Sequence, residues 1–414
     1  MYKDGDEEVM VAKQKIVGLN GDEASAYATK QVDPDVVAAY PITPQTIIVE
    51  RLSEYVADGL VGSEFVAVES EHSALSACVG ASAAGARAFT ATAANGLALM
   101  WEILYIAAGL RQPIVMAVAN RCLGGPINIH NDHSDAMGAR DSGWIQLFCE
   151  NSQEVYDASV EAWRIAEHAD IQMPVMVNFD GFTISHTMEN VYILEDADVK
   201  KFVGKRIYMK TEGPKGEVEF KLDPDTPISI GPLDLQDFYF EHKVQQMEAM
   251  KGTLKAIKAV DKEFEKIIGR RLEYVYPYKM DDAEVAVVGL GSAMGTVREV
   301  VDELRAEGVK AGMVKMRLFR PFPVEELKNA IGDVPVLGVM EKAYSIGGPG
   351  APLYEEVKTA LYDLPKRPFV ADYINGLGGK DTSPEMIRDV FKSLQKIKER
   401  GAVLEPVSYV GVRE

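Results

Sequence analysis

Short apolar segments alternate with helical segments along residues 1–180, and this alternation limits the possible folds more than any other feature. The apolar segments are residues 36–39, 65–68, 88–92, 113–120 and 175–179. Helical patterns lie between them, at residues 23–31, 46–55, 96–111 and 153–168 and from Glu71 onwards. Continuously apolar strands are buried on both faces, so the alternation predicts a parallel sheet covered by helices. Functional residues of such sheets cluster at the carboxyl ends of the strands.

A second, smaller unit of the same kind follows after an irregular region. Residues 195–250 contain repeated turn signals and predict a long excursion that packs on another surface. A charged amphipathic helix then runs from Glu241 to Ile268, and strand–helix alternation resumes at Ala283. We therefore predict an α/β fold with two domains, residues 1–262 and residues 263–414.

Charge and composition exclude several classes of function. The net charge is −19, which disfavours nucleic-acid binding because that requires a basic face. No apolar run approaches the ~20 residues of a membrane span. The acidic start, Met1–Glu8, is the opposite of a secretory signal, so we expect a cytoplasmic protein.

The 3 cysteines, Cys78, Cys122 and Cys149, lie far apart and form no Cys-x-x-Cys pair. This spacing excludes a self-contained four-cysteine iron–sulfur cluster or structural zinc site. No metal ligand set is predicted for this chain.

Three side chains at strand ends are candidates for chemistry. Glu71 begins a helix made almost wholly of small residues, Thr43 lies in a rigid turn between Pro41 and Pro44, and Arg121 ends a strand. Alone, Glu71 could be a favourable charge at a helix N-terminus, and Arg121 could form a structural salt bridge as readily as grip a carboxylate. Together, they are expected to converge at one edge of one sheet.

Two other motifs are weaker. Gly289–Gly295 follows a strand like a dinucleotide-binding loop, but its third glycine comes one residue late and no acidic ribose ligand follows, which favours a tight strand-to-helix turn. Asn131–Asp135 could bind a hard cation, although we favour side chains that satisfy the loop backbone and hold the Arg121 segment.

In these and other motifs, the chain resembles the α subunit of 2-oxoacid:ferredoxin oxidoreductases, and within that family the pyruvate type. The matching motifs are Tyr40-Pro-Ile-Thr-Pro-Gln-Thr46, Ser70-Glu-His-Ser-Ala-Leu, Gly80-Ala-Ser-Ala-Ala-Gly85, Asn120-Arg121 with Asp132-His-Ser-Asp135, Asp141-Ser-Gly-Trp-Ile-Gln146, Pro174–Phe182, Phe319–Pro323 and Gly376-Leu-Gly-Gly379. The resemblance covers nearly the whole chain.

The resemblance implies a thiamine diphosphate enzyme that converts pyruvate and coenzyme A to acetyl-CoA and CO2, reversibly, with electrons passed to ferredoxin. It implies that residues 1–262 form a pyrimidine-binding domain and that residues 263–414 resemble a transketolase C-terminal domain. By the same resemblance, Glu71 binds the aminopyrimidine ring of the cofactor, Arg121 holds the substrate carboxylate and Thr43 binds substrate. Pro41, Thr43 and Glu71 are the cofactor-binding residues that it implies.

The resemblance also implies partner subunits. The chain has no Gly-Asp-Gly motif followed by an Asn-Asn type motif, with which related enzymes hold the diphosphate and Mg²⁺. A β subunit would supply that grip, the metal and a [4Fe-4S] cluster, and γ and ferredoxin-like δ subunits would complete the complex. Three alternatives remain: a branched-chain 2-oxoacid enzyme, a noncatalytic assembly subunit, and a nicotinamide-dependent dehydrogenase that uses Gly289–Gly295. Thr43 argues against an oxalate-type relative.

Overall fold

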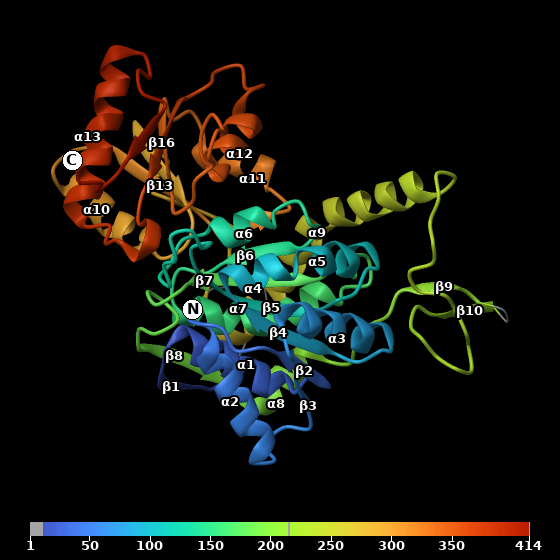
Figure 1. The fold of residues 1–414 in the computed structure, drawn as a ribbon. Coiled ribbons are helices and arrows are strands. Elements are labelled where there is room, and N and C mark those ends of the chain that lie inside the picture. Colours follow the sequence, from blue (N-terminus) through green and yellow to red (C-terminus); the bar gives the residue numbers. More distant parts are fainter. Residues whose placement is uncertain (1–10, 214–215, 414) are drawn as a thin grey trace, which may run out of the picture.

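The computed structural model describes residues 11–213 and 216–413. It contains two mainly parallel sheets with helices on both faces, which confirms the α/β fold class (Figure 1). The acidic first residues, Met1–Glu8, lie outside the described residues.

The first sheet has 7 strands in the order β14-β6-β7-β5-β4-β2-β3. They are β2 (Val36–Ala39), β3 (Glu64–Ala67), β4 (Ala88–Thr92), β5 (Val115–Asn120), β6 (Ile145–Phe148), β7 (Val175–Asp180) and β14 (Leu318–Arg320). All pairs are parallel except that of β14 with β6. β4, β5 and β7 are buried along their whole length, which explains their continuously apolar sequences.

Helices cover both faces of this sheet. They are α1 (Gly21–Val32), α2 (Thr46–Ala57), α3 (Glu71–Ala83), α4 (Ala94–Leu99), α5 (Trp101–Gly109), α6 (Ser134–Gly138) and α7 (Ser152–Ala166). Side chains of α3, α4 and α5 form one apolar cluster against the sheet, and those of α1 and α7 belong to a larger cluster. The single helix expected over residues 96–111 is two helices, which meet at Met100.

The second sheet has 6 strands in the order β11-β13-β12-β15-β16-β17, and only β11 is antiparallel to its neighbour. Its strands are β11 (Val275–Tyr278), β12 (Val285–Gly289), β13 (Ala311–Met316), β15 (Val336–Glu341), β16 (Phe369–Ile374) and β17 (Val407–Tyr409). Its helices are α10 (Ala293–Ala306), α11 (Val324–Ile331), α12 (Pro352–Leu361), a short 3₁₀ turn η1 (Leu377–Gly379) and α13 (Pro384–Arg400).

Two buried carboxylates of this sheet hold the start of α12. Glu341 accepts hydrogen bonds from the N–H groups of Leu353 and Tyr354, both at 2.8 Å, and Asp372 accepts one from Ala351 at 2.9 Å. Burial raises the pKa of Asp372 to about 6. Protein carboxylates therefore already occupy the donors at this helix terminus.

The two sheets share one apolar core. A single cluster contains Trp163 of α7 and Phe264 of α9 (Tyr239–Ile268) together with Val288 of β12. Inside it, Arg317 donates to Glu161 and, at 3.0 Å, to Asp261, and all three side chains are buried. Burial raises the pKa of both carboxyls, and Arg317 opposes that rise. Removal of Arg317 would leave two buried acids without their cation.

Several elements differ from the sequence expectation. The pattern predicts neither β6 nor β8 (Glu189–Leu194); β8 forms a two-stranded ribbon with β1 (Gln14–Leu19). The irregular region contains α8 (Asp196–Val203) and the hairpin of β9 (Lys210–Gly213) and β10 (Gly216–Glu219). β6 and β8 pair with β14 and β1, which are distant in sequence, and a local pattern does not record such pairing.

The excursion extends to one side of the molecule (Figure 1). Tyr208 donates to the carbonyl of Gly85 at 2.8 Å and Leu222 to that of Ala83 at 2.8 Å, so part of it packs on the end of α3, as expected. The amino half of α9 projects outward and Phe240 is 71% exposed. Across the described residues, no helix combines the length and apolarity needed to cross a lipid bilayer.

Candidate active site

Glu71 lies at the first turn of α3, directly after β3. The Ser70 hydroxyl caps the helix by accepting from the N–H of Ser73 at 3.3 Å. The Glu71 side chain is only 7% exposed although it begins a helix on an edge of the sheet. It lies over Gly96 of α4, where a Cβ atom would be 2.7 Å from Glu71 Oε1 and 2.4 Å from Thr92 Oγ1. Only glycine leaves room for the carboxylate in this position.

The turn that holds Pro41 and Thr43 follows β2. Both residues are exposed, as ligand-facing residues would be. The buried Gln45 donates from Nε2 to the carbonyl of Ala91 at 2.7 Å and to that of Tyr40 at 3.1 Å. These two bonds tie the turn to the end of β4.

Arg121 follows β5 and links the turn to α4. Its Nη1 donates to the Thr43 carbonyl at 2.5 Å, and its Nη2 donates to Asn95 Oδ1 at 3.4 Å. The side chain is 5% exposed, and within the described part of the chain its buried Nε has no hydrogen-bond partner. The guanidinium is thus oriented by protein groups and retains an unused donor.

The three sequence-predicted side chains therefore lie at the ends of β2, β3 and β5, and Asn95 and Gly96 after β4 join them. Asn95 also accepts from the N–H of Gly124 at 3.3 Å. Asn95 and Gly96 were not among the predicted site residues, although an Asn-Gly pair directly after a buried strand is a signal for them. Arg121 thus contacts the Thr43 turn and Asn95, whose neighbour Gly96 contacts Glu71.

The geometry fits the expected thiamine diphosphate. The strand ends at Glu71 and Arg121 carry a buried carboxylate beside a glycine whose missing Cβ leaves room for it. Two buried polar atoms there, Arg121 Nε and Thr92 Oγ1, have no hydrogen-bond partner among residues 11–213 and 216–413. Buried polar groups are nearly always hydrogen-bonded, so such atoms point to a ligand. A carboxylate substrate suits the free arginine N–H.

The Asn131–Asp135 segment satisfies backbone and side-chain groups, as favoured from its sequence. Asp132 accepts from the N–H of Ser134 at 2.9 Å, Asn131 donates to Thr183 at 2.9 Å, and Asp135 accepts from the N–H of Arg121 at 3.0 Å. In the part of the chain that the structure describes, no group of three or more His, Cys, Asp or Glu residues is arranged to hold a metal ion.

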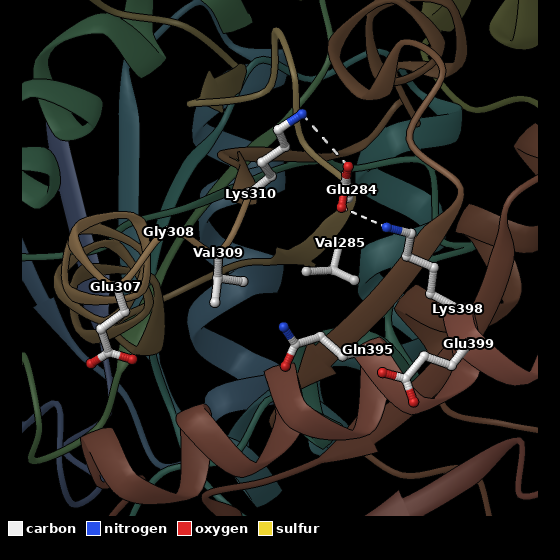
Figure 2. A pocket seen from close by; sticks show the side chains of 9 residues that line it. All are labelled: Glu284, Val285, Glu307, Gly308, Val309, Lys310, Gln395, Lys398 and Glu399. Atoms are coloured by element: carbon white, nitrogen blue, oxygen red, sulfur yellow. Dashed lines mark hydrogen bonds and ion pairs between the residues drawn. The ribbon is translucent and has the colours of Figure 1, made fainter.

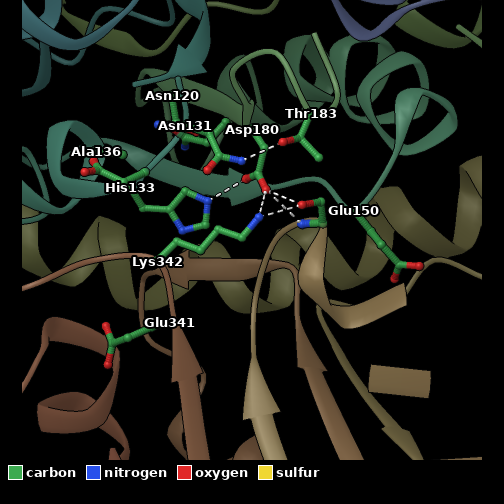
Figure 3. A network of polar contacts seen from close by, with 12 residues as sticks. Asn120, Asn131, His133, Ala136, Glu150, Asp180, Thr183, Glu341 and Lys342 are labelled. Carbon is green, nitrogen blue, oxygen red and sulfur yellow. Dashed lines mark hydrogen bonds and ion pairs between the residues drawn. The ribbon is translucent and has the colours of Figure 1, made fainter. Parts of the chain in front are cut away.

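A buried charge network joins the two sheets beside this segment (Figure 3). Asp180, at the end of β7, accepts from His133 at 2.6 Å and from Lys342 at 2.6 Å, and Ser292 also donates to it. Burial alone would raise the pKa of Asp180, but Lys342 and His133 outweigh it and hold that pKa well below its usual value. The carboxylate is therefore charged and locks the sheets together.

This network lies against the glycine loop of Gly289–Gly295. A Cβ on Gly291, whose φ is +76°, would lie 2.9 Å from the His133 ring and 3.0 Å from Asp180. The loop packs on the first sheet, which supports its interpretation as a tight turn and leaves no room for a dinucleotide at that position.

A surface groove of about 320 Å³ lies at the opposite end of the second sheet, before β12 and β13 (Figure 2). Three of its charged groups pair with one another, because Glu284 accepts from Lys398 at 2.5 Å and contacts Lys310 at 3.6 Å. The strand ends at Glu71 and Arg121 remain the better candidate for chemistry.

Comparisons with known proteins identify relatives of the whole chain. A family model described as pyruvate flavodoxin/ferredoxin oxidoreductase, thiamine diphosphate-binding, matches residues 27–262, and one described as pyruvate:ferredoxin oxidoreductase core domain II matches residues 283–387. The chain is 53% identical over 398 residues to pyruvate synthase subunit PorA of Thermotoga maritima, covering 96% of this chain and 98% of that protein. It is 41% identical over 392 residues to ketoisovalerate oxidoreductase subunit VorA of Pyrococcus horikoshii, covering 94% and 96%.

Two solved structures share the fold. A 2-oxoglutarate:ferredoxin oxidoreductase from Magnetococcus marinus aligns with a TM-score of 0.70 at 22% identity, over 91% of this chain and 65% of that chain. A split-gene transketolase, solved as an inactive tetramer, aligns with a TM-score of 0.52 at 15% identity, over 92% and 99%. The transketolase-like architecture expected from the sequence is thereby confirmed.

Proposed function

The chain belongs to the pyruvate flavodoxin/ferredoxin oxidoreductase family, and from that premise we propose that it is the α subunit of a pyruvate synthase complex. The reaction joins the acetyl group of pyruvate to coenzyme A, releases CO2 and a proton, and passes two electrons to ferredoxin; it is reversible. The 53% identity to a pyruvate synthase subunit over 96% of the chain carries this proposal. We propose two domains: residues 1–262, which bind the pyrimidine, and residues 263–414, which resemble a transketolase C-terminal domain. The family matches to residues 27–262 and 283–387 support this division.

When bound, thiamine diphosphate supplies the nucleophilic carbon and the electron sink that decarboxylation of a 2-oxoacid requires. Glu71 would hold the pyrimidine ring and share a proton with it at a carboxylate oxygen. Because Glu71 is only 7% exposed, this contact would be largely protected from water. Pro41 and Thr43 would border the same ring. These roles rest on the resemblance and on the position of Glu71 over Gly96.

Arg121 would bind the substrate carboxylate. Two of its nitrogens are oriented by Thr43 and Asn95, so that Nε remains to donate to a ligand. The backbone carbonyl of Thr43 accepts a hydrogen bond from Arg121. The hydroxyl of Thr43 would therefore remain free to bind the substrate. A pre-oriented guanidinium binds a carboxylate with less loss of side-chain entropy than a free one.

The chain supplies only half of such a site. It lacks the diphosphate-binding motif, and its three cysteines are free, buried and too far apart in sequence for a cluster. We propose that a β subunit brings Mg²⁺, the diphosphate grip and a [4Fe-4S] cluster, that γ and δ subunits complete the complex, and that ferredoxin accepts the electrons. Free thiols also support a cytoplasmic location, since disulfides are rare in that compartment.

A branched-chain 2-oxoacid enzyme is the alternative within the family, since the ketoisovalerate oxidoreductase subunit is 41% identical. The higher identity to pyruvate synthase subunits favours pyruvate. A noncatalytic assembly subunit is a third possibility, and the experiment below separates it.

The test uses the co-purified complex. Reduction of methyl viologen with coenzyme A and either pyruvate or 2-oxoisovalerate is measured for wild type, Glu71→Gln and the control Glu69→Gln, which alters an exposed carboxylate two residues away. We expect pyruvate turnover, a loss of at least ~10²-fold in Glu71→Gln and little change in the control. Turnover with the branched acid alone would identify the alternative substrate, and unchanged turnover in Glu71→Gln would indicate an assembly subunit.

A further inference from the structure

Asp135, at the start of α6, is a buried carboxylate on which four hydrogen bonds converge. Oδ1 accepts from Asn120 Nδ2 at 2.9 Å and from the N–H of Ala136 at 2.7 Å. Oδ2 accepts from the N–H of Ala94 at 2.9 Å and from the N–H of Arg121 at 3.0 Å. The side chain is 4% exposed, so water does not replace these partners.

The two bonds to Oδ2 reach both sides of the candidate site. Arg121 is the proposed substrate-binding residue, and its backbone is held directly. Ala94 has a φ of +40°, a conformation that is unfavourable for a residue with a Cβ, and it is followed by Asn95 and Gly96. Asn95 accepts from the Arg121 guanidinium, and Gly96 lies under Glu71.

We propose that Asp135 is a positioning residue of the active site, which holds the Arg121 guanidinium and the Gly96 surface under Glu71 in register through two backbone N–H groups. This inference rests on the proposed function, because the two groups that it aligns are the proposed substrate and cofactor contacts. Asp135 itself would contact neither the substrate nor the cofactor; its effect passes through Arg121 and α4.

The chemistry of the four donors requires a carboxylate at this position. Each oxygen accepts two hydrogen bonds and neither has a proton to donate. An asparagine is the same size, but its NH2 group must face at least one backbone N–H: that of Ala136 in one orientation, or those of Ala94 and Arg121 in the other. Asp135→Asn therefore breaks part of the arrangement without leaving a cavity.

Protonation of Asp135 has a similar effect. Burial raises the pKa of Asp135 to about 6, against the hydrogen bonds from Arg121, Asn120 and Ala94, which lower it. The charge of Asp132, in its own loop, adds to the rise, whereas Arg121 acts on Asp135 through its backbone N–H; α4 has no titratable side chain. At neutral pH the Asp135 carboxylate is ionised and accepts all four hydrogen bonds. Below about pH 6 it gains a proton, which then faces N–H donors instead of an acceptor and disrupts one side of the arrangement.

The experiment compares Asp135→Asn with Asp132→Asn in the complete complex. Asp132 is equally buried, lies in the same loop and bonds to Ser134 within that loop, so it is a matched control. The kcat and KM for pyruvate are measured by methyl viologen reduction, with the thermal midpoint measured beside them. We expect a tenfold or greater rise in KM and a fall in kcat/KM on the order of 10²-fold for Asp135→Asn, because small misplacements of binding groups are costly. The control should change by less than threefold.

A lower thermal midpoint with unchanged KM in Asp135→Asn would show a purely structural role and overturn the proposal. Should this variant fail to assemble, the wild-type complex decides: KM for pyruvate should rise as pH falls from 7.5 through 6 to 5, and a constant KM would refute the inference. Failure of the proposed function is separate, since the wild-type complex would then show no pyruvate-dependent reduction at all.

Discussion

Gly96→Ala is the sharpest test of the geometry at Glu71. The added methyl group would lie 2.7 Å from Glu71 Oε1 and 2.4 Å from Thr92 Oγ1, where ordinary contact begins at 3.4 Å. Thr92 Oγ1 must move by about 1.0 Å and the Glu71 carboxylate by about 0.7 Å to restore ordinary contact. Because a displacement near 1 Å costs about 10²-fold in rate, we expect kcat/KM for pyruvate to fall between ~10-fold and ~10²-fold.

The effect on stability should be small and separable from the effect on activity. Alanine in place of glycine favours a helix by about 1 kcal/mol. Overpacking costs about 1–3 kcal/mol, so the free energy of unfolding should decrease by about 2 kcal/mol at most.

Gly252→Ala provides the matched control. Gly252 lies within α9, and a Cβ there meets no atom of the described residues within 4 Å. This variant should unfold at the same temperature as wild type or slightly higher and keep its activity within twofold. The assay is methyl viologen reduction by the intact complex. Wild-type kcat/KM in Gly96→Ala, or an equal loss in both variants, would refute the placement of Glu71 over Gly96.

Three further predictions concern the buried charges. Arg317→Met leaves two buried carboxylates without their cation and should lower the free energy of unfolding by about 3–5 kcal/mol in urea, whereas Arg388→Ala, which removes exposed ion pairs, should cost less than about 1 kcal/mol; equal losses would contradict the buried position. Burial raises the pKa of Asp372 to about 6 in the folded state, above its unfolded value, so its contribution to stability falls as pH rises from about 4 to about 6 and is constant above. Asp372→Asn should therefore gain stability relative to wild type, on the order of 1 kcal/mol, between pH 5 and pH 7.5, and a pH-independent difference would be the contrary result. Lys342→Met leaves the Asp180 carboxylate short of its cation and should destabilise the junction of the sheets by about 3 kcal/mol, measured by thermal unfolding at pH 7.5, with an unchanged midpoint as the opposing outcome.

The amino-acid sequence by itself determined the fold class and most of the parallel strands. β4, β5 and β7 are buried on both faces, so their sequences are continuously apolar and recognisable without a structure. Glu71 and Arg121 were also accessible, because each is a charged residue directly after such a strand, where ligands of parallel sheets bind.

Tertiary structure alone decided the remaining elements and the supporting residues. β6 and β8 pair with β14 and β1, which lie far away in the chain. Asp135 contacts the Ala94 N–H, 41 residues distant. A local pattern records which residues favour a strand or a turn, whereas hydrogen bonds between distant segments exist only after the chain has packed. The position of Glu71 over Gly96 and the bonds of Asp135 are therefore properties of the fold.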